Sequence, residues 1–149
     1  MAILHTAMSE IKFLSIRFRA FAQATEIEER VLAAMKFASG TEEVNVTATT
    51  GHFGNPITVF ETELLKAGQI KNFLGRLAEA HIPENLIGQE EERVDEECAF
   101  HFRLDKQKAY LEELALASGR DVIDVRLKVG VYPARREAAV AAIKEWLAD

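Results

Sequence analysis

The stretch DVIDVRLKVGV, residues 121–131, is the clearest indication of the fold. Apolar side chains alternate with charged ones along it, and the apolar set is Ile123, Val125, Leu127, Val129 and Val131. An alternation with period two is typical of a strand that is buried on one face and wet on the other. Strands of a parallel sheet, buried on both faces, read instead as continuous apolar runs. This stretch therefore predicts an antiparallel sheet with one open face.

The same alternation recurs elsewhere in the chain. In residues 11–21 it places Leu14, Ile16, Phe18 and Ala20 inward, and in residues 98–104 it places Cys98, Phe100, Phe102 and Leu104 inward. Two further β-rich runs, 42–50 and 56–65, lie between these strands. Helical spacing of apolar residues follows in 24–40, 69–81, 105–116 and after Pro133. The order β-α-β-β-α-β-α-β-α predicts a single α+β domain, with a mostly antiparallel sheet and helices packed on one face.

The helix over 24–40 has recognisable ends. Thr25 with Glu28 three residues later predicts a capping box, and Gly40 can close the helix. Residues predicted on its buried face are Ile27, Val31, Ala34, Met35 and Ala38.

The length and composition limit the classes of protein. A chain of 149 residues fits one domain, which we place at 10–149, with residues 1–9 as a disordered extension. It contains neither a stretch of about 18 apolar residues nor a secretory signal pattern, so no membrane span is expected. Cys98 is the single cysteine, which excludes an internal disulfide and suits the reducing cytoplasm.

The charge is unevenly distributed. The formal net charge of −6 argues against generic affinity for nucleic acid, because lysine and arginine carry phosphate binding. The acidic side chains are concentrated in residues 26–100, however, and both ends of the chain are slightly basic. A basic patch can therefore still be built from the two ends.

The outward positions of the predicted strands form the most informative set of polar residues. They are Arg17, Arg19, His101, Arg103, Arg126 and Lys128. Arginine makes planar, bidentate contacts to phosphate, which suits an RNA backbone. The alternative is a solvated face with cross-strand ion pairs, since Glu61 and Glu63 lie on a neighbouring strand. The residue pattern alone favours that alternative.

The stretch TTGHFGNPIT, residues 49–58, connects the two β-rich runs. It is neither a Walker loop nor a dinucleotide-binding glycine motif. Its glycines and Asn55-Pro56 are typical of a tight turn, and a hairpin connection is the favoured interpretation. His52 and Asn55 could still hydrogen-bond to a ligand, and Phe53 could stack on a base.

Catalytic and metal-binding patterns are weak. The histidines and Cys98 are scattered without ligand spacing, and the chain contains no nucleophile elbow. Cys98 falls on an apolar face, which is typical of an inert core thiol. The run Glu90–Glu92 does not place two carboxylates on one face, so it indicates a solvated surface. We predict no catalytic residue, metal or cofactor, and a small hydrolase or nuclease is the least favoured function.

The segment RLDKQ, residues 103–107, leaves a strand and enters a helix. Asp105 can cap that helix, and Lys106 and Lys108 follow it beside the predicted basic face. The alternative is an ordinary capped helix with lysines facing solvent.

Several fragments together resemble one family. IRFRAFAQATEIEERVLAAM, TGHFGNPITVFETEL, FHFRLDKQKAYLEELALASGRDVIDVRLKV and YPARREAA resemble, in that order, the archaeal family of RNA-binding proteins, also predicted to be exosome subunits. The resemblance spans residues 11–142 and implies the fold of the ribosomal protein that binds 5S RNA. Residues that match its motifs are Gly51, His52, Gly54, Asn55, Pro56, Arg103, Asp105, Lys106, Gln107, Arg126, Lys128, Pro133 and Arg135. The chain departs from the family pattern at Asp124 and Gln23, which weakens the local positive potential.

Two functions follow from the residues and the resemblance. The first is a non-enzymatic RNA-binding module in the cytoplasm, an accessory of the exosome or of ribosome biogenesis, that takes structured RNA. Its predicted contacts are Arg17, Arg19, His52, Asn55, Arg103, Lys106, Arg126, Lys128, Arg135 and Arg136. The alternative is a protein-interaction module without RNA affinity, which uses open sheet edges and the acidic run 90–97 to bind a partner or a second copy.

Overall fold

The predicted sheet forms the centre of the structure. In the computed structural model, which describes residues 11–51 and 53–149, five strands pair in the order β2-β3-β1-β5-β4, and each pairing is antiparallel. The strands are β1 (Phe13–Gln23), β2 (Asn45–Thr50), β3 (Pro56–Leu64), β4 (Ala99–Asp105) and β5 (Val122–Val129). The predicted α+β fold is confirmed. The extension predicted at residues 1–9 lies outside the described residues.

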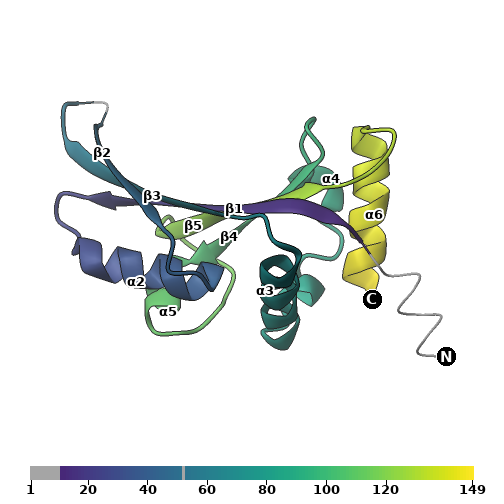
Figure 1. Ribbon diagram of the computed structural model, residues 1–149, viewed down its shortest axis with the longest axis horizontal. Helices are drawn as coiled ribbons and strands as arrows, with labels where there is room; N and C mark the ends of the chain where they lie inside the picture. The colour runs from purple at the N-terminus through teal and green to yellow at the C-terminus, as the bar shows by residue number, and fades with distance from the viewer. Residues whose placement is uncertain (1–10, 52) are drawn as a thin grey trace.

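Most of the helices lie on one side of this sheet (Figure 1). They are α2 (Glu28–Ser39), α3 (Ala67–Glu79), α4 (Glu90–Arg93), α5 (Lys106–Tyr110) and α6 (Arg136–Ala148), with a short 3₁₀ turn η1 (Pro83–Asn85). Figure 1 shows α2, α3 and α5 below the sheet, while α6 stands across the end where β1 begins. The opposite side of the sheet carries the polar positions of the strands and is called the open face below.

The core lies between the sheet and these helices. Phe18 of β1 meets Phe73 of α3 edge to face, with ring centroids 4.9 Å apart. At the far end, the Trp146 ring of α6 lies 5.2 Å from Phe13 and 6.3 Å from Phe100. Edge-to-face aromatic pairs add about 0.5–1.5 kcal/mol beyond the apolar area they bury. These contacts fix α3 against β1, and α6 against β1 and β4.

The start of β1 departs from the simple alternation. Phe13 pairs with Val129 and Ser15 pairs with Lys128, so the register of β1 against β5 shifts between Phe13 and Ser15. The extra residue of such a bulge leaves the ladder and exchanges the two faces of the strand. Phe13 is therefore buried, and the prediction that Leu14 points inward is wrong, because Leu14 is 48% exposed.

The two ends of α2 turned out differently. Gly40 closes the helix in a left-handed conformation with φ of 77°, as predicted. The prediction of a capping box is wrong, because Ile27 occupies the N-cap position and no side chain caps the helix there. Glu26 instead accepts a hydrogen bond from the backbone N–H of Gln23 at 3.2 Å. This earlier turn leaves Ile27 exposed rather than on the buried face.

On either side of β4, the structure confirms the predicted cap of α5 and corrects the predicted helix length and the environment of Glu90. Asp105 caps α5 by accepting from the N–H of Lys108 at 2.9 Å, although the helix ends at Tyr110, well before residue 116. In the acidic run, Glu90 is only 6% exposed and accepts from the N–H of Gly88 at 3.0 Å. The interpretation of this run as wholly solvated is therefore wrong at Glu90.

Candidate nucleic-acid interface

The strand registers bring the predicted outward residues onto the open face. Arg17 lies between Glu63 and Arg126, and His101 follows beside Arg126. In the next row, Arg19 lies between Glu61 and Asp124, and Arg103 follows beside Asp124. Acidic and basic side chains alternate in the second row, whereas Arg17 and Arg126 are neighbours in the first. The four arginines of the two rows face three carboxylates, so the face is nearly balanced in charge.

The two arginines of β1 are held loosely. Arg17 Nη2 lies 3.6 Å from Glu63 Oε2, and Arg19 Nε lies 3.6 Å from Glu61 Oε2. Both arginine side chains remain 52% exposed. Exposed ion pairs of this kind stabilise a protein by at most about 1 kcal/mol. A phosphate can therefore replace the carboxylate at either arginine for a small cost in free energy.

The basic side chains of β4 and β5 differ in how far they are exposed to solvent. Arg103 Nε donates to Asp124 Oδ1 at 3.0 Å, yet its side chain is 67% exposed. Arg126 is only 24% exposed and lies 3.8 Å from Asp95 and 3.5 Å from Glu97. Lys128 donates to the backbone carbonyl of Glu97. Of the three, Arg103 is the most accessible to a ligand.

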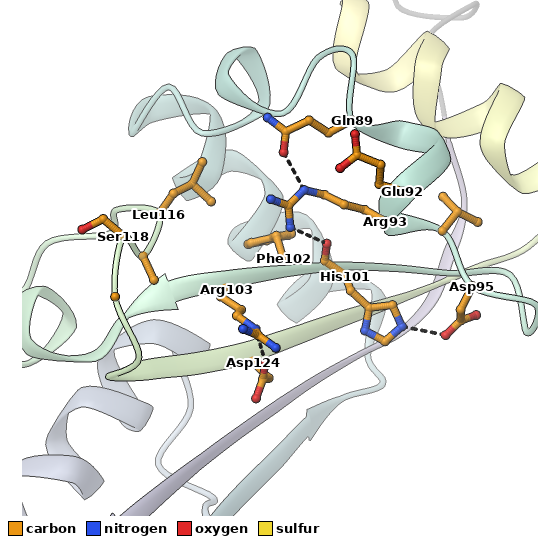
Figure 2. Close-up of a pocket in the computed structure, with 13 residues that line it drawn as sticks. Gln89, Glu92, Arg93, Asp95, His101, Phe102, Arg103, Leu116, Ser118 and Asp124 are labelled. Carbon is orange, nitrogen blue, oxygen red and sulfur yellow. Dashed lines mark hydrogen bonds and ion pairs between the residues drawn. The ribbon is translucent and has the colours of Figure 1, made fainter.

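A pocket of about 610 Å³ lies along the outer edge of β4, between α4 and residues 116–119 (Figure 2). Arg93 crosses it, donating from Nε to Gln89 at 2.7 Å and from Nη1 to the carbonyl of His101 at 3.3 Å. Further along the edge, the N–H of Ala117 donates to the carbonyl of Arg103 at 2.9 Å. These bonds occupy carbonyls that a bare edge strand would offer to another chain. The sequence reasoning missed Arg93, since nothing in its spacing marks it as an edge cap.

Asp95 lines this pocket and also contacts His101 of the open face. Its Oδ2 lies 2.6 Å from His101 Nε2, and its Oδ1 accepts from the N–H of Ala99 at 3.0 Å. Burial on its own would raise the pKa of the Asp95 carboxyl. Hydrogen bonds from His101 and from the backbone of Ala99 and Glu97 outweigh burial, so the pKa lies below its usual value. The group is therefore an ionised partner for His101 at neutral pH.

Lys106 occupies a different environment from its prediction. Its side chain is 5% exposed, and Nζ lies 2.8 Å from both Glu26 Oε2 and Asp121 Oδ1. The same amine donates to the backbone carbonyl of Phe21 at 2.7 Å. An ammonium has three protons to donate, and these three acceptors match them. Lys106 therefore ties α5 to β1 and to the start of β5, and it offers no proton to a phosphate.

The two consecutive arginines at the start of α6 differ in their contacts. Arg136 donates from Nε to the carbonyl of Val94 at 3.0 Å and from Nη1 to Glu91 Oε2 at 3.3 Å, and it also contacts the Glu91 carbonyl. These bonds fasten α6 to α4. Arg135 is exposed, and among the described residues its side chain makes no ion pair. Only Arg135 of this pair is accessible in the way the sequence predicts.

The glycine-containing stretch is the turn of the β2–β3 hairpin. The N–H of Gly51 donates to the carbonyl of Asn55 at 2.6 Å, and Gly54 adopts φ of 79°. A Cβ at position 51 would lie 2.6 Å from Ile57 Cδ1 and 3.2 Å from the Asn55 carbonyl oxygen, so a larger residue there would require the Ile57 side chain to shift. The hairpin interpretation is confirmed by this pairing. Phe53 and Asn55 are exposed at its tip, and His52 lies outside the described residues.

Metal binding and membrane insertion are two other classes of function to which the described residues are relevant. Within 11–51 and 53–149, no three histidine, cysteine, aspartate or glutamate side chains are grouped so that they could hold a metal ion. In the same part of the chain, no helix is both long and apolar enough to cross a membrane.

Both the sequence and the fold relate the chain to a known family. A family model described as "RNA binding" matches residues 15–129, which is most of the chain and includes the whole sheet apart from the start of β1. The chain belongs to this RNA-binding family.

Individual relatives come from archaea. A protein of Pyrococcus abyssi named as an RNA-binding protein is 42% identical over 142 residues, covering 89% of this chain and 92% of the relative. A crystal structure of a protein from Archaeoglobus fulgidus, family DUF54, covers 91% of this chain and 99% of its own, with 38% identity and a TM-score of 0.81. A DUF54 protein of Methanothermobacter thermautotrophicus covers 91% and 98%, with 30% identity and a TM-score of 0.76.

Proposed function

We propose that this protein is a non-enzymatic RNA-binding module that contacts the RNA backbone through its open face. Membership of the RNA-binding family supports the ligand class. The observation that carries the proposal is the state of Arg17, Arg19 and Arg103, which are at least half exposed and each form an ion pair with one exposed carboxylate. Phosphate oxygens compete well for such guanidinium groups, because charge-assisted, bidentate contacts are short and strong.

The proposed contacts are a subset of the basic residues on the chain. Arg17, Arg19 and Arg103 contact phosphates, and Arg126 and Lys128 add positive potential from β5. Lys106 and Arg136 are not included, because their donors already bind protein groups. Arg135 extends the surface near α6. The hairpin tip with His52 and Asn55 contacts sugar or base, as RNA loops present both to protein side chains.

The wider role that we propose is accessory to RNA degradation by the exosome or to ribosome biogenesis, in the cytoplasm. A domain whose phosphate contacts are partly balanced by its own carboxylates binds RNA moderately and is sensitive to salt. Such affinity suits a protein that delivers or releases structured RNA rather than one that packages it. Exosome subunits are the protein partners that we would test first.

The experiment is fluorescence anisotropy with a structured RNA at low and near-physiological salt. Arg17→Gln/Arg19→Gln should weaken binding by roughly tenfold or more and lower the salt slope by about one to two. The matched control is Lys66→Gln/Lys71→Gln, which removes two exposed cations at α3, on the helical side of the sheet. Equal losses in both variants, or no binding by the unaltered protein at low salt, would contradict the proposal.

The alternative function is a protein-interaction module, and one observation favours it. β2 is an edge strand whose six residues are all exposed, including Val46 at 48%. A free edge of this kind can pair with a second copy or with a partner strand. Analytical ultracentrifugation of the protein and of a Val46→Lys variant tests it. A dimer that dissociates in the variant, together with absence of RNA binding, would favour this alternative.

A further inference from the structure

We infer that the end of the open face holds an unpaired nucleobase, in a pocket formed where β1 and β5 separate. This inference rests on the proposed RNA binding. The pairing of β1 with β5 ends at Arg19 and Asp124, whereas β1 continues along β3 as far as Gln23 and Ile57. The last residues of β1 therefore have β3 on one side and a gap on the other. A pocket of about 620 Å³ lies there.

The walls of the pocket carry groups that suit a base. Phe21 is an aromatic residue 41% exposed, and its cross-strand partner on β3 is the apolar Val59. The guanidinium of Arg19 lies 5.1 Å from the centroid of this ring. Aromatic rings and arginine planes are the surfaces on which unstacked RNA bases lie. The volume also falls within the range of about 300–1,000 Å³ that is usual for small-ligand sites.

Polar groups surround this stacking surface. Gln23 and Gln107, which both carry side-chain amides, line the pocket. Gln107 Nε2 donates to Asp121 Oδ2 at 2.6 Å, which fixes the orientation of that amide. An oriented amide can then read the hydrogen-bonding edge of a base. Arg120 also lines the pocket; it is exposed and makes no ion pair among the described residues, so it can bind the phosphate of the same nucleotide.

The pocket is held open before any ligand enters. Lys106 lies at its inner wall and bonds to the carbonyl of Phe21 on one side and to Asp121 on the other. The buried Lys106 amine therefore links the backbone of Phe21 to Asp121, the residue next to Arg120, and holds these two lining segments together. A preformed site loses less conformational entropy on binding than one that must be ordered. This is a role for Lys106 that needs no contact with RNA.

The test compares a single-stranded oligouridine that carries one 2-aminopurine with a blunt RNA duplex that has no unpaired nucleotide. We expect the unaltered protein to quench 2-aminopurine fluorescence. For Phe21→Ala, we expect this quenching to be lost and single-strand affinity to fall by roughly tenfold to a hundredfold. Phe21→Tyr should keep both. Duplex affinity, which depends on the arginines, should stay the same in all three proteins.

A matched control is Tyr132→Ala, because Tyr132 is an aromatic residue 99% exposed and does not line this pocket. Unchanged single-strand binding by Phe21→Ala, while the unaltered protein binds both RNAs, would overturn the base pocket and leave the backbone interface standing. An equal loss on single strand and duplex would also overturn it. Failure of the unaltered protein to bind either RNA would overturn the pocket together with the proposed function.

Discussion

The open face and the Lys106 cluster are two ways in which this protein arranges cations beside carboxylates. Arg17 and Arg19 each have one carboxylate at 3.6 Å and are half exposed, whereas Lys106 has two at 2.8 Å and is 5% exposed. In water an exposed pair contributes little and exchanges partners readily. Inside the protein, loss of one partner leaves a charge without solvent or counter-ion. Burial, rather than the presence of an acidic neighbour, therefore separates cations accessible to a ligand from cations that hold the fold.

The largest effect that we predict is on stability at Lys106. Lys106→Met should cost about 2–3 kcal/mol, because the Phe21 carbonyl and the partly exposed carboxylates of Glu26 and Asp121 lose their shared donor. The melting temperature should fall by roughly 10 °C. Lys108→Met is the control, since Lys108 is exposed on the same helix. Similar melting temperatures for the two variants would remove the distinction between the two regions.

A smaller effect should separate Arg136 from Arg135. Arg136→Gln removes hydrogen bonds to the Val94 carbonyl and to Glu91, and should cost about 1–2 kcal/mol. Arg135→Gln should change the free energy of unfolding by less than about 0.5 kcal/mol, as is usual for an exposed side chain. Chemical denaturation of both variants measures the difference. The reverse order would show that α6 is not fastened to α4 through Arg136.

The smallest effect that we predict is on the pH dependence of stability at Asp121. Burial alone would raise the pKa of Asp121, but hydrogen bonds from Lys106 and Gln107 outweigh burial and lower it. A carboxyl whose pKa is lower in the folded state stabilises the fold above its unfolded pKa of about 3.9, and this contribution disappears as the pH falls through the folded value. Asp121→Asn should therefore be less stable than the unaltered protein at neutral pH, with the difference shrinking below about pH 4. A constant difference across that range would contradict the assignment.

Much of the fold could be predicted from local patterns. The alternation in residues 121–131 predicted β5 and its two faces correctly, because residues 122–128 pair with β4 without a shift in register. The same rule failed at Leu14, since the bulge at the start of β1 arises from pairing with a distant strand. The capping box failed for a related reason, because Glu26 and Thr25 belong to a turn that precedes the helix.

The candidate site was less predictable than the fold. Sequence showed that Arg17 and Arg19 would share a face and that Glu61 and Glu63 were near, but not how exposed the pairs would be. Lys106 looks like any lysine in a helix, and its three acceptors come from segments as far as 85 residues away. Phe21 reads as one more outward position of a strand. Its pocket exists only because β5 leaves β1 at Arg19.

The central claim is that carboxylates and phosphates compete for the arginines of the open face. It is tested most directly by RNA affinity of Glu61→Gln/Glu63→Gln at low and near-physiological salt. Removing the competing carboxylates should strengthen binding several-fold and steepen the salt dependence. Glu28→Gln/Glu29→Gln makes the same change in net charge at α2, on the helical side of the sheet, and should have a much smaller effect. Unchanged or weaker binding by the β3 variant, or an equal gain in both, would contradict the account.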